Sequence, residues 1–198
     1  MATIRRQLLA SLGAMSVGAP TNGRLLVATP PLVDPNFDRT VVYVIEHTDE
    51  GALGLVLNRP TDEDELPGLH SWLAASSSPA VLFDGGPVEI DALIGLARAE
   101  GESEGFAPIR DGLGTVDLEA EPEQLDVALR EVRVFRGYSG WGPGQLDDEL
   151  EAGAWIVLDA EPGDPFTHDP DGLWRAVLRR QGGRLAWLAN CPDDISAN

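Results

Sequence analysis

Residues 39–58, RTVVYVIEHTDEGALGLVLN, decide the fold because they contain two strand-forming runs joined by a short turn. The first run, 39–48, is rich in β-branched and aromatic side chains, and the second run, 52–58, is almost entirely apolar. Three residues, DEG, separate the runs, and this spacing with a glycine is typical of a β-hairpin. The stretch therefore predicts two adjacent antiparallel strands, around which the other elements have to be arranged.

Apolar runs that predict further strands lie on both sides of the hairpin. They are 23–31, GRLLVATPP; 80–88, AVLFDGGPV; 132–138, VRVFRGY; 154–160, AWIVLDA; and 184–190, RLAWLAN. Helices are expected over 143–152, closed by Gly153, and after Asp169 and Pro170, which suit an N-cap and a first turn. Because helices and strands alternate irregularly, the sequence predicts an α/β (α+β) protein with a mixed β-sheet, a hairpin and covering helices. A chain of 198 residues has room for a small sub-lobe.

The net charge limits the partners that the chain can have. The 14 basic residues, all of them Arg, stand against 33 acidic residues, so the net charge is −19. Such a field repels nucleic acid and anionic membrane surfaces, and neither is expected as a direct partner. The best basic group, Arg175, Arg179, Arg180 and Arg184, is interpreted as a solvated helix face because no DNA-binding motif surrounds it.

Cysteine usage and hydropathy indicate the compartment. Cys191 is the only cysteine, which excludes an internal disulfide and a cysteine-based zinc site and suits a cytoplasmic protein. No apolar run approaches the roughly 18 residues that would suggest a membrane span.

The N-terminal residues 1–22 differ from the rest of the chain, and they are predicted to form a basic arm or helix before a single domain over 23–198. They contain Arg5 and Arg6 and no acidic residue. The paired arginines resemble a twin-arginine export signal, but the apolar part that follows is short and interrupted by Ser and Gly. Ile4, Leu8, Leu12 and Met15 fall on one helix face, so a surface or docking helix is the favoured interpretation.

The glycine-rich stretch 137–150, GYSGWGPGQLDDEL, allows three interpretations. It departs from the G-x-S-x-G nucleophile elbow because Trp141 stands where the last glycine belongs, so Ser139 is expected to be a turn hydroxyl. The glycines could let main-chain amides approach a phosphate, but a P-loop needs a Lys-Ser/Thr ending and this chain has no lysine, and the acidic residues of the following helix would repel phosphate. The favoured interpretation is a structural corner in which Trp141, Pro143 and Leu146 pack or shape the turn.

A candidate ligand site lies beside this corner. Arg59 follows a buried-looking strand, where a guanidinium needs either a carboxylate such as Asp38, Glu46 or Asp84 or an anionic ligand. The GGPV turn brings main-chain amides to a neighbouring strand end. The predicted ligand-binding residues are Arg39, Asn58, Arg59, Gly85, Gly86, Pro87, Gly140 and Gln145. No catalytic residue or cofactor is predicted, and no metal site is predicted because His47, His70 and His168 lack metal-ligand spacing.

Taken together, the motifs LLVATPPLVDPNFDRTVVYVIEHTDEGALGLVLNRP, GGPV and GYSGWGPGQLDDEL resemble those of the AlgH/YqgE family of bacterial proteins. The closing LWRAVLRRQGGRLAWLANCPDD is similar to the actinobacterial members. The predicted ligand-binding residues all match the family signature. The resemblance implies a compact α/β protein with no established catalytic residues or cofactor, and a transcriptional-regulator label that rests on genetic association. Where family members commonly have L-E-x-E-L, this chain has Asp147 in place of the first glutamate.

The sequence therefore favours a cytoplasmic, non-enzymatic regulatory or ligand-binding protein, with an unidentified protein partner or small-molecule ligand. The alternative is an enzyme that acts on a phosphorylated or nucleotide-like small molecule at Arg59 and the glycine turns. A direct DNA-binding regulator is the least favoured class, because the charge of the chain opposes it.

Overall fold

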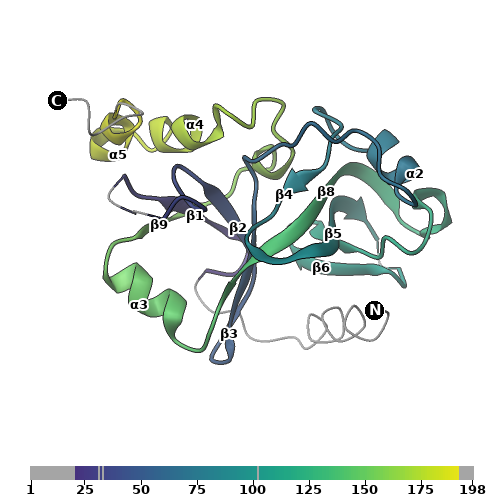
Figure 1. Cartoon of the computed structure of the whole chain (residues 1–198), viewed down its shortest axis with the longest axis horizontal. Coiled ribbons are helices and arrows are strands. Elements are labelled where there is room, and N and C mark those ends of the chain that lie inside the picture. The colour runs from purple at the N-terminus through teal and green to yellow at the C-terminus, as the bar shows by residue number, and fades with distance from the viewer. Residues whose placement is uncertain (1–20, 31, 33, 102, 192–198) are drawn as a thin grey trace.

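A computed structural model describes residues 21–30, 32, 34–101 and 103–191 (Figure 1). The strands are β1 Arg24–Ala28, β2 Val41–Thr48, β3 Gly51–Val56, β4 Phe83–Asp84, β5 Val88–Glu100, β6 Phe106–Arg110, β7 Leu113–Val116, β8 Ala128–Trp141 and β9 Trp155–Asp159. The helices are α2 His70–Ala74, α3 Gln145–Glu151, α4 Leu173–Arg179 and α5 Gly183–Leu188, with 3-10 turns η1 Pro122–Gln124 and η2 Asp164–Phe166. Most of the predicted N-terminal arm, residues 1–20, lies outside the described residues.

The described strands form one curled, mixed sheet in the order β6-β7-β5-β8-β3-β2-β1-β9. Neighbours on this path are antiparallel, and the short β4 pairs with β8 in parallel. The predicted hairpin is confirmed as β2 and β3, whose register runs from Thr48 opposite Gly51 to Val42 opposite Val56. The sheet dominates the fold, and the helices cover only part of it.

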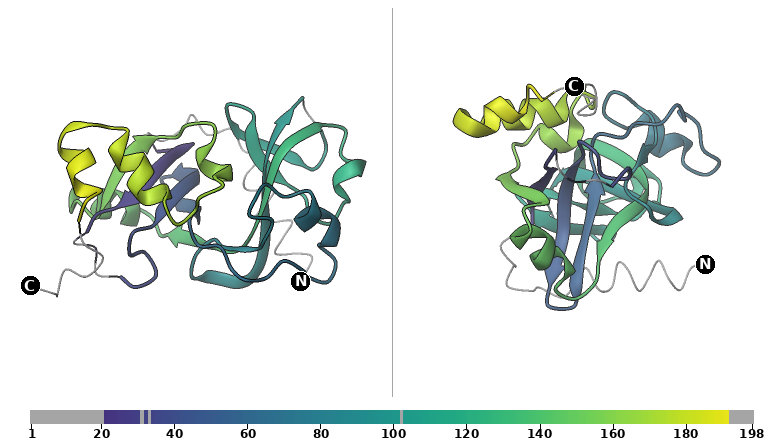
Figure 2. Two further views of the ribbon diagram at one scale, coloured as in Figure 1. Left: turned by 90° about the horizontal axis from the view of Figure 1, so that it is seen from above. Right: turned by 60° about the vertical axis from the view of Figure 1, so that its left-hand side comes forward.

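The long strand β8 connects the two parts of the sheet, which Figure 2 shows side by side. Its last residues pair with β3, with Trp141 opposite Ala52, whereas the rest of the strand pairs with β5. The side of the molecule formed by β5, β6 and β7 encloses a core of its own, which includes Trp72, Leu82 and Val134. One strand thus belongs to both parts, and this explains why a single sheet can enclose separate cores.

Strands β1 and β2 are buried on both faces. Leu25 and Val27 contribute to the core beneath α4, whereas the alternate residue Leu26 contributes to the core beneath α3. This alternation follows from the two-residue period of a strand. Figure 1 shows the consequence, because α3 lies on one side of these strands and α4 with α5 lies on the other. Continuous apolar runs such as VVYVI are what a strand buried on both faces requires.

The structure corrects two sequence-based expectations about local structure. Residues 184–190, expected to be a last strand, lie in and after helix α5, where Leu185 and Leu188 pack against the core and Trp187 is exposed. Spacings of three fit one helix face, but a short apolar run gives no period long enough to exclude a strand. Residues 139–141, expected to belong to the turn, continue strand β8, and the turn is confined to the residues just before α3.

Gly86 gives the first testable prediction. An added Cβ would lie 2.4 Å from the Tyr138 carbonyl and the φ angle is +149°, so Gly86→Ala should destabilise the protein. We expect a loss of roughly 2–4 kcal/mol in the free energy of unfolding, from backbone strain plus overpacking.

Gly163→Ala is the matched control, because its φ is −79° and no atom lies within 4 Å of the added Cβ. Its effect should stay within about 0.5 kcal/mol or be slightly stabilising. Denaturant unfolding of both variants measures the difference, and equal midpoints would contradict the close approach.

Candidate functional site

The main chain of the predicted GGPV segment packs directly against the main chain of β8. A Cβ on Gly86 would lie 2.4 Å from the Tyr138 carbonyl and 2.5 Å from the Ser139 nitrogen. A Cβ on Gly85 would lie 2.4 Å from the carbonyl oxygen of Gly137. The glycines are needed here because no side chain fits between the two segments.

Hydrogen bonds within the fold occupy both main-chain groups of Gly85 and the hydroxyl of Ser139. The Gly85 nitrogen donates to the Arg136 carbonyl at 2.8 Å, and the Gly85 carbonyl accepts from the Val56 nitrogen at 2.9 Å. The same carbonyl accepts from the hydroxyl of Ser139 at 3.2 Å. Ser139 is fully buried, so its hydroxyl is a structural donor of a strand and has no access to a substrate.

Asn58 holds the main chain that enters the hairpin. Its Oδ1 accepts from the Val41 nitrogen and its Nδ2 donates to the Arg39 carbonyl, both at 2.9 Å. Asn58 is 3% exposed, and Arg39 has a φ of +52°, a conformation that few residues other than glycine adopt. The amide therefore stabilises an unfavourable backbone turn just before β2.

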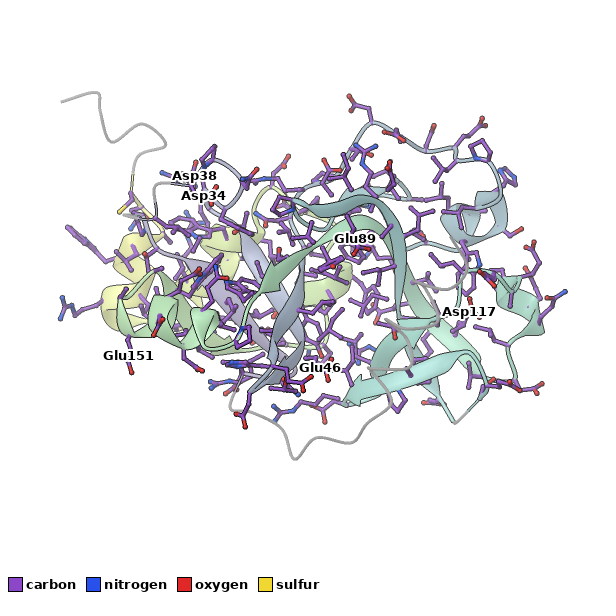
Figure 3. The ribbon with its side chains drawn as sticks, turned by 60° about the horizontal axis from the view of Figure 1, so that its bottom comes forward. Asp34, Asp38, Glu46, Glu89, Asp117 and Glu151 are labelled. Atoms are coloured by element: carbon purple, nitrogen blue, oxygen red, sulfur yellow. The ribbon has the colours of Figure 1, made fainter. Side chains whose placement is uncertain are left out.

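Arg59 bonds to main-chain carbonyls rather than to a carboxylate. Its Nη1 donates to the Asn58 carbonyl at 3.4 Å and its Nη2 donates to the carbonyl of Asp38, a residue labelled in Figure 3. Asp84, one of the expected partners, pairs instead with Arg136 at 2.7 Å. Arg59 forms no ion pair with the described residues, and main-chain carbonyls alone hold its guanidinium.

Arg39 connects the start of β2 to the end of the described chain. Its guanidinium lies 5.0 Å from the ring centroid of Trp174 on α4, and its Nη2 donates to the Cys191 carbonyl at 3.3 Å. Cation–π contact and hydrogen bonding together orient this side chain. Arg39 thus links the hairpin to the helical face.

The corner before α3 is organised by one carboxylate. Glu149 Oε2 accepts from the indole nitrogens of Trp141 at 2.9 Å and Trp155 at 2.7 Å. Glu149 Oε1 accepts from Gln145 Nε2 at 2.9 Å, while Gln145 Oε1 accepts from the Gly142 nitrogen at 3.1 Å. The charge of Glu149 strengthens the three bonds that it accepts, so Glu149 fixes both tryptophans directly and the turn through Gln145.

Apolar packing completes the corner. Trp141 is 6% exposed, and its ring centroid lies 6.0 Å from that of Trp155 and 6.3 Å from that of Phe37. Leu146 is 1% exposed, whereas Pro143 stands in the exposed turn. The Trp141 ring therefore fills the space between β8 and α3.

A buried histidine lies next to this corner. His47 is 4% exposed; its Nδ1 is 2.6 Å from Thr21 Oγ1, and its Nε2 is 3.7 Å from Asp147 Oδ1. Burial raises the pKa of the neighbouring Glu46 carboxyl, and the negative charge of Glu50 adds to this shift. The imidazole of His47 therefore contacts both Thr21 and Asp147 of α3 at the end of β2. Thr21 is 3% exposed, so this hydroxyl also has no access to solvent.

The predicted ligand-binding residues fall into two groups. Arg59 is connected to the GGPV segment because its carbonyl accepts from the Asp84 nitrogen at 2.9 Å. Gly140 is opposite Leu53 across β3 and β8, close to the GGPV segment. Gln145 lies apart, on α3 with Glu149, and in the described residues no hydrogen bond joins it to Arg59.

Sequence reasoning missed Glu149 and Arg133. Arg133 is 0% exposed; its guanidinium donates to the carbonyls of Pro165, Ser78 and Thr167 at 3.0–3.1 Å and lies 4.2 Å from the Phe83 ring centroid. Burial lowers the pKa of Arg133 to about 10, so it stays charged at neutral pH. An arginine between valines in VRVF was the available signal, since that alternation leaves Arg133 on the face opposite its neighbours.

Trp141→Ala should cost roughly 3–5 kcal/mol of unfolding free energy, because it empties a large core site and removes a donor to Glu149. The same substitution at Trp187, which is 77% exposed, should stay within about 0.5 kcal/mol. Ser139→Ala should cost about 1 kcal/mol, because Gly85 keeps its main-chain donor. Denaturant unfolding of the three variants measures these effects, and a near-neutral Trp141→Ala would contradict the packed corner.

Comparisons with known proteins agree with the motifs. The AlgH-like family model matches residues 25–186. A UPF0301 protein of Streptomyces avermitilis is 49% identical over 193 residues, covering 94% of this chain and 100% of the relative. A UPF0301 protein of Mycobacterium tuberculosis is 44% identical over 181 residues, covering 89% and 90% of the two chains.

Solved structures share the fold. The crystal structure of a Corynebacterium diphtheriae protein has a TM-score of 0.79 at 28% identity and covers 91% of this chain and 97% of its own. The solution structure of the AlgH protein from Pseudomonas aeruginosa has a TM-score of 0.64 at 27% identity, covering 91% and 100%. The family inferred from the motifs is confirmed, and the chain belongs to the AlgH-like, UPF0301 family.

Proposed function

We propose that this chain is a non-enzymatic regulatory protein that binds an anionic group of a small ligand or partner protein at Arg59. The observation that carries the proposal is the state of Arg59, which is half-buried, oriented by two main-chain carbonyls and in no ion pair with the described residues. A guanidinium has five N–H donors, and two bonds leave donors for a ligand.

The candidate nucleophiles of the described residues support binding over catalysis. Nucleophilic catalysis requires an accessible nucleophile beside a base. Ser139 is fully buried and donates to Gly85, while Thr21, the hydroxyl next to His47, is 3% exposed. These hydroxyl groups stabilise the fold, whereas the guanidinium of Arg59 is partly exposed and forms no ion pair with the described residues.

The proposed setting is the cytoplasm, which suits the single cysteine, Cys191. No helix in the described residues is long and apolar enough to cross a membrane.

A thermal-shift screen of anionic metabolites tests the proposal. A ligand at 100 times its Kd stabilises a protein by about 2.7 kcal/mol, whatever its chemistry. We expect such a ligand to stabilise the wild type, with the shift strongly reduced in Arg59→Gln.

Arg130→Gln is the matched control, because it removes the same charge from an exposed side chain paired with Glu100 at 2.8 Å. The control should respond like the wild type. A ligand that stabilises Arg59→Gln as much as the wild type would place the site elsewhere, and chemical turnover of the ligand would favour an enzyme.

The charge also predicts the behaviour with DNA. At −19, the purified protein should bind duplex DNA no better than a neutral control protein at physiological salt. Tight, sequence-dependent retardation in a gel-shift titration, with a steep salt dependence, would contradict this expectation.

A further inference from the structure

Two large hydrophobic side chains of the described residues are strongly exposed. Trp187 is 77% exposed and Ile90 is 64% exposed. Single exposed hydrophobics are common, so exposure alone indicates nothing. These two side chains differ in the charges beside them, because arginines accompany Trp187 and acidic residues flank Ile90.

Trp187 lies on α5 in a basic part of an acidic molecule. Residues 172–191 contain four arginines and no acidic residue. Of these, Arg180 is paired with Asp164 at 2.6 Å, whereas Arg179 and Arg184 are exposed and form no ion pair with the described residues. Arg184 and Trp187 are three residues apart on α5, and Arg179 ends α4, which packs against α5. We call Arg179, Arg184 and Trp187 the tryptophan patch.

Ile90 lies on an acidic bulge of β5. The register of β5 against β8 passes from Val88 opposite Tyr138 to Leu93 opposite Arg136, so residues 89–92 face a single residue of β8. The two neighbours of Ile90 in the chain are Glu89 and Asp91, and both are exposed. We call Glu89, Ile90 and Asp91 the isoleucine bulge.

The conformation of the bulge is held by the fold. Glu89 has a φ of +43°, which is unfavourable for a residue with a side chain and persists only where the surroundings impose it. Its Oε1 accepts from the Tyr138 hydroxyl at 3.3 Å. A Cβ on Gly137 would lie 3.4 Å from the Ile90 Cα, so the glycine gives the bulge room. Ile90 is therefore presented by a defined backbone.

We propose that the tryptophan patch of one copy binds the isoleucine bulge of a second copy. Each surface has an apolar centre flanked by charges, positive in the patch and negative in the bulge, so the two are complementary. A net charge of −19 repels a second copy over most of the surface. Asp169 and Asp171 precede the stretch 172–191 and Asp193 and Asp194 follow it, but within it Arg179 and Arg184 are exposed positive charges that attract the acidic surface of a second copy.

The two surfaces are separate on one molecule. Figure 3 labels Glu89 near the middle of the molecule, away from the yellow α5 at one end. The isoleucine bulge of one chain therefore does not contact the tryptophan patch of the same chain. A contact between copies joins two different surfaces and is heterologous. Each bound pair leaves one patch and one bulge open for further association.

Sedimentation velocity over a concentration series tests the proposal with the full chain. We expect the wild type to self-associate, and Trp187→Ala and Ile90→Ser each to raise the dissociation constant about tenfold or more. Both side chains are exposed, so the variants should keep the wild-type unfolding midpoint. Asp91→Arg should weaken association similarly, whereas Glu123→Arg, the same charge reversal at an exposed residue of η1, should not.

Mixing the two defective variants gives the decisive result. Trp187→Ala keeps an intact bulge and Ile90→Ser keeps an intact patch, so an equimolar mixture should form a one-to-one pair that neither variant forms alone. A wild type that stays monomeric at every concentration would overturn the proposal. So would variants that associate like the wild type, or a mixture that forms no pair.

Discussion

The fold depends on one close contact, between the main chains of Gly85 and Gly86 and that of residues 137–139 of β8. A side-chain carbon at either glycine would come within 2.4 Å of opposing main-chain atoms. This contact lies where β8 passes from its pairing with β5 to its pairing with β3. Because β8 belongs to both parts of the sheet, the position of each core relative to the other depends on that contact. Main-chain packing of this kind tolerates little change, since interiors are as dense as organic crystals.

Next to this contact, at the end of β8, the hydrogen bonds of Glu149 constrain the fold as well. Glu149 accepts both indole N–H groups of the Trp141 and Trp155 pair, and Gln145 completes its shell. A carboxylate in a half-buried position is costly unless it is hydrogen-bonded, and here three donors offset that cost. The acidic run that argued against phosphate binding at the sequence level thus has an internal role. The same helix also carries Asp147, which reaches toward His47.

The sequence was sufficient for the parts of the fold that depend on local pattern. The hairpin of β2 and β3 followed from two β-branched runs and a three-residue turn, and α3 followed from its glycine and proline boundaries. The sequence was insufficient where the structure at a residue depends on contacts with residues far away in the chain. A glycine that permits a turn and a glycine that permits close approach look identical in a sequence. Gly137 belongs to a stretch that predicts a corner, whereas the structure requires a glycine there because φ is +63° and the Gly86 carbonyl approaches closely. The partners of Arg59 were also missed, because main-chain carbonyls carry no sequence signal. Helix α5 was mistaken for a strand because six residues show too little periodicity to decide.

The buried Arg133 couples segments that are otherwise independent. Its guanidinium is bonded to the carbonyl of Ser78, in the loop after α2, and to those of Pro165 and Thr167 around η2. If either loop opened alone, the charge would lose part of its hydrogen bonding while the other loop still kept it from water, and this is unfavourable for a buried cation. The two loops are therefore expected to open together. In hydrogen exchange they would behave as one cooperative unit whose protection reflects a shared opening free energy rather than two local ones.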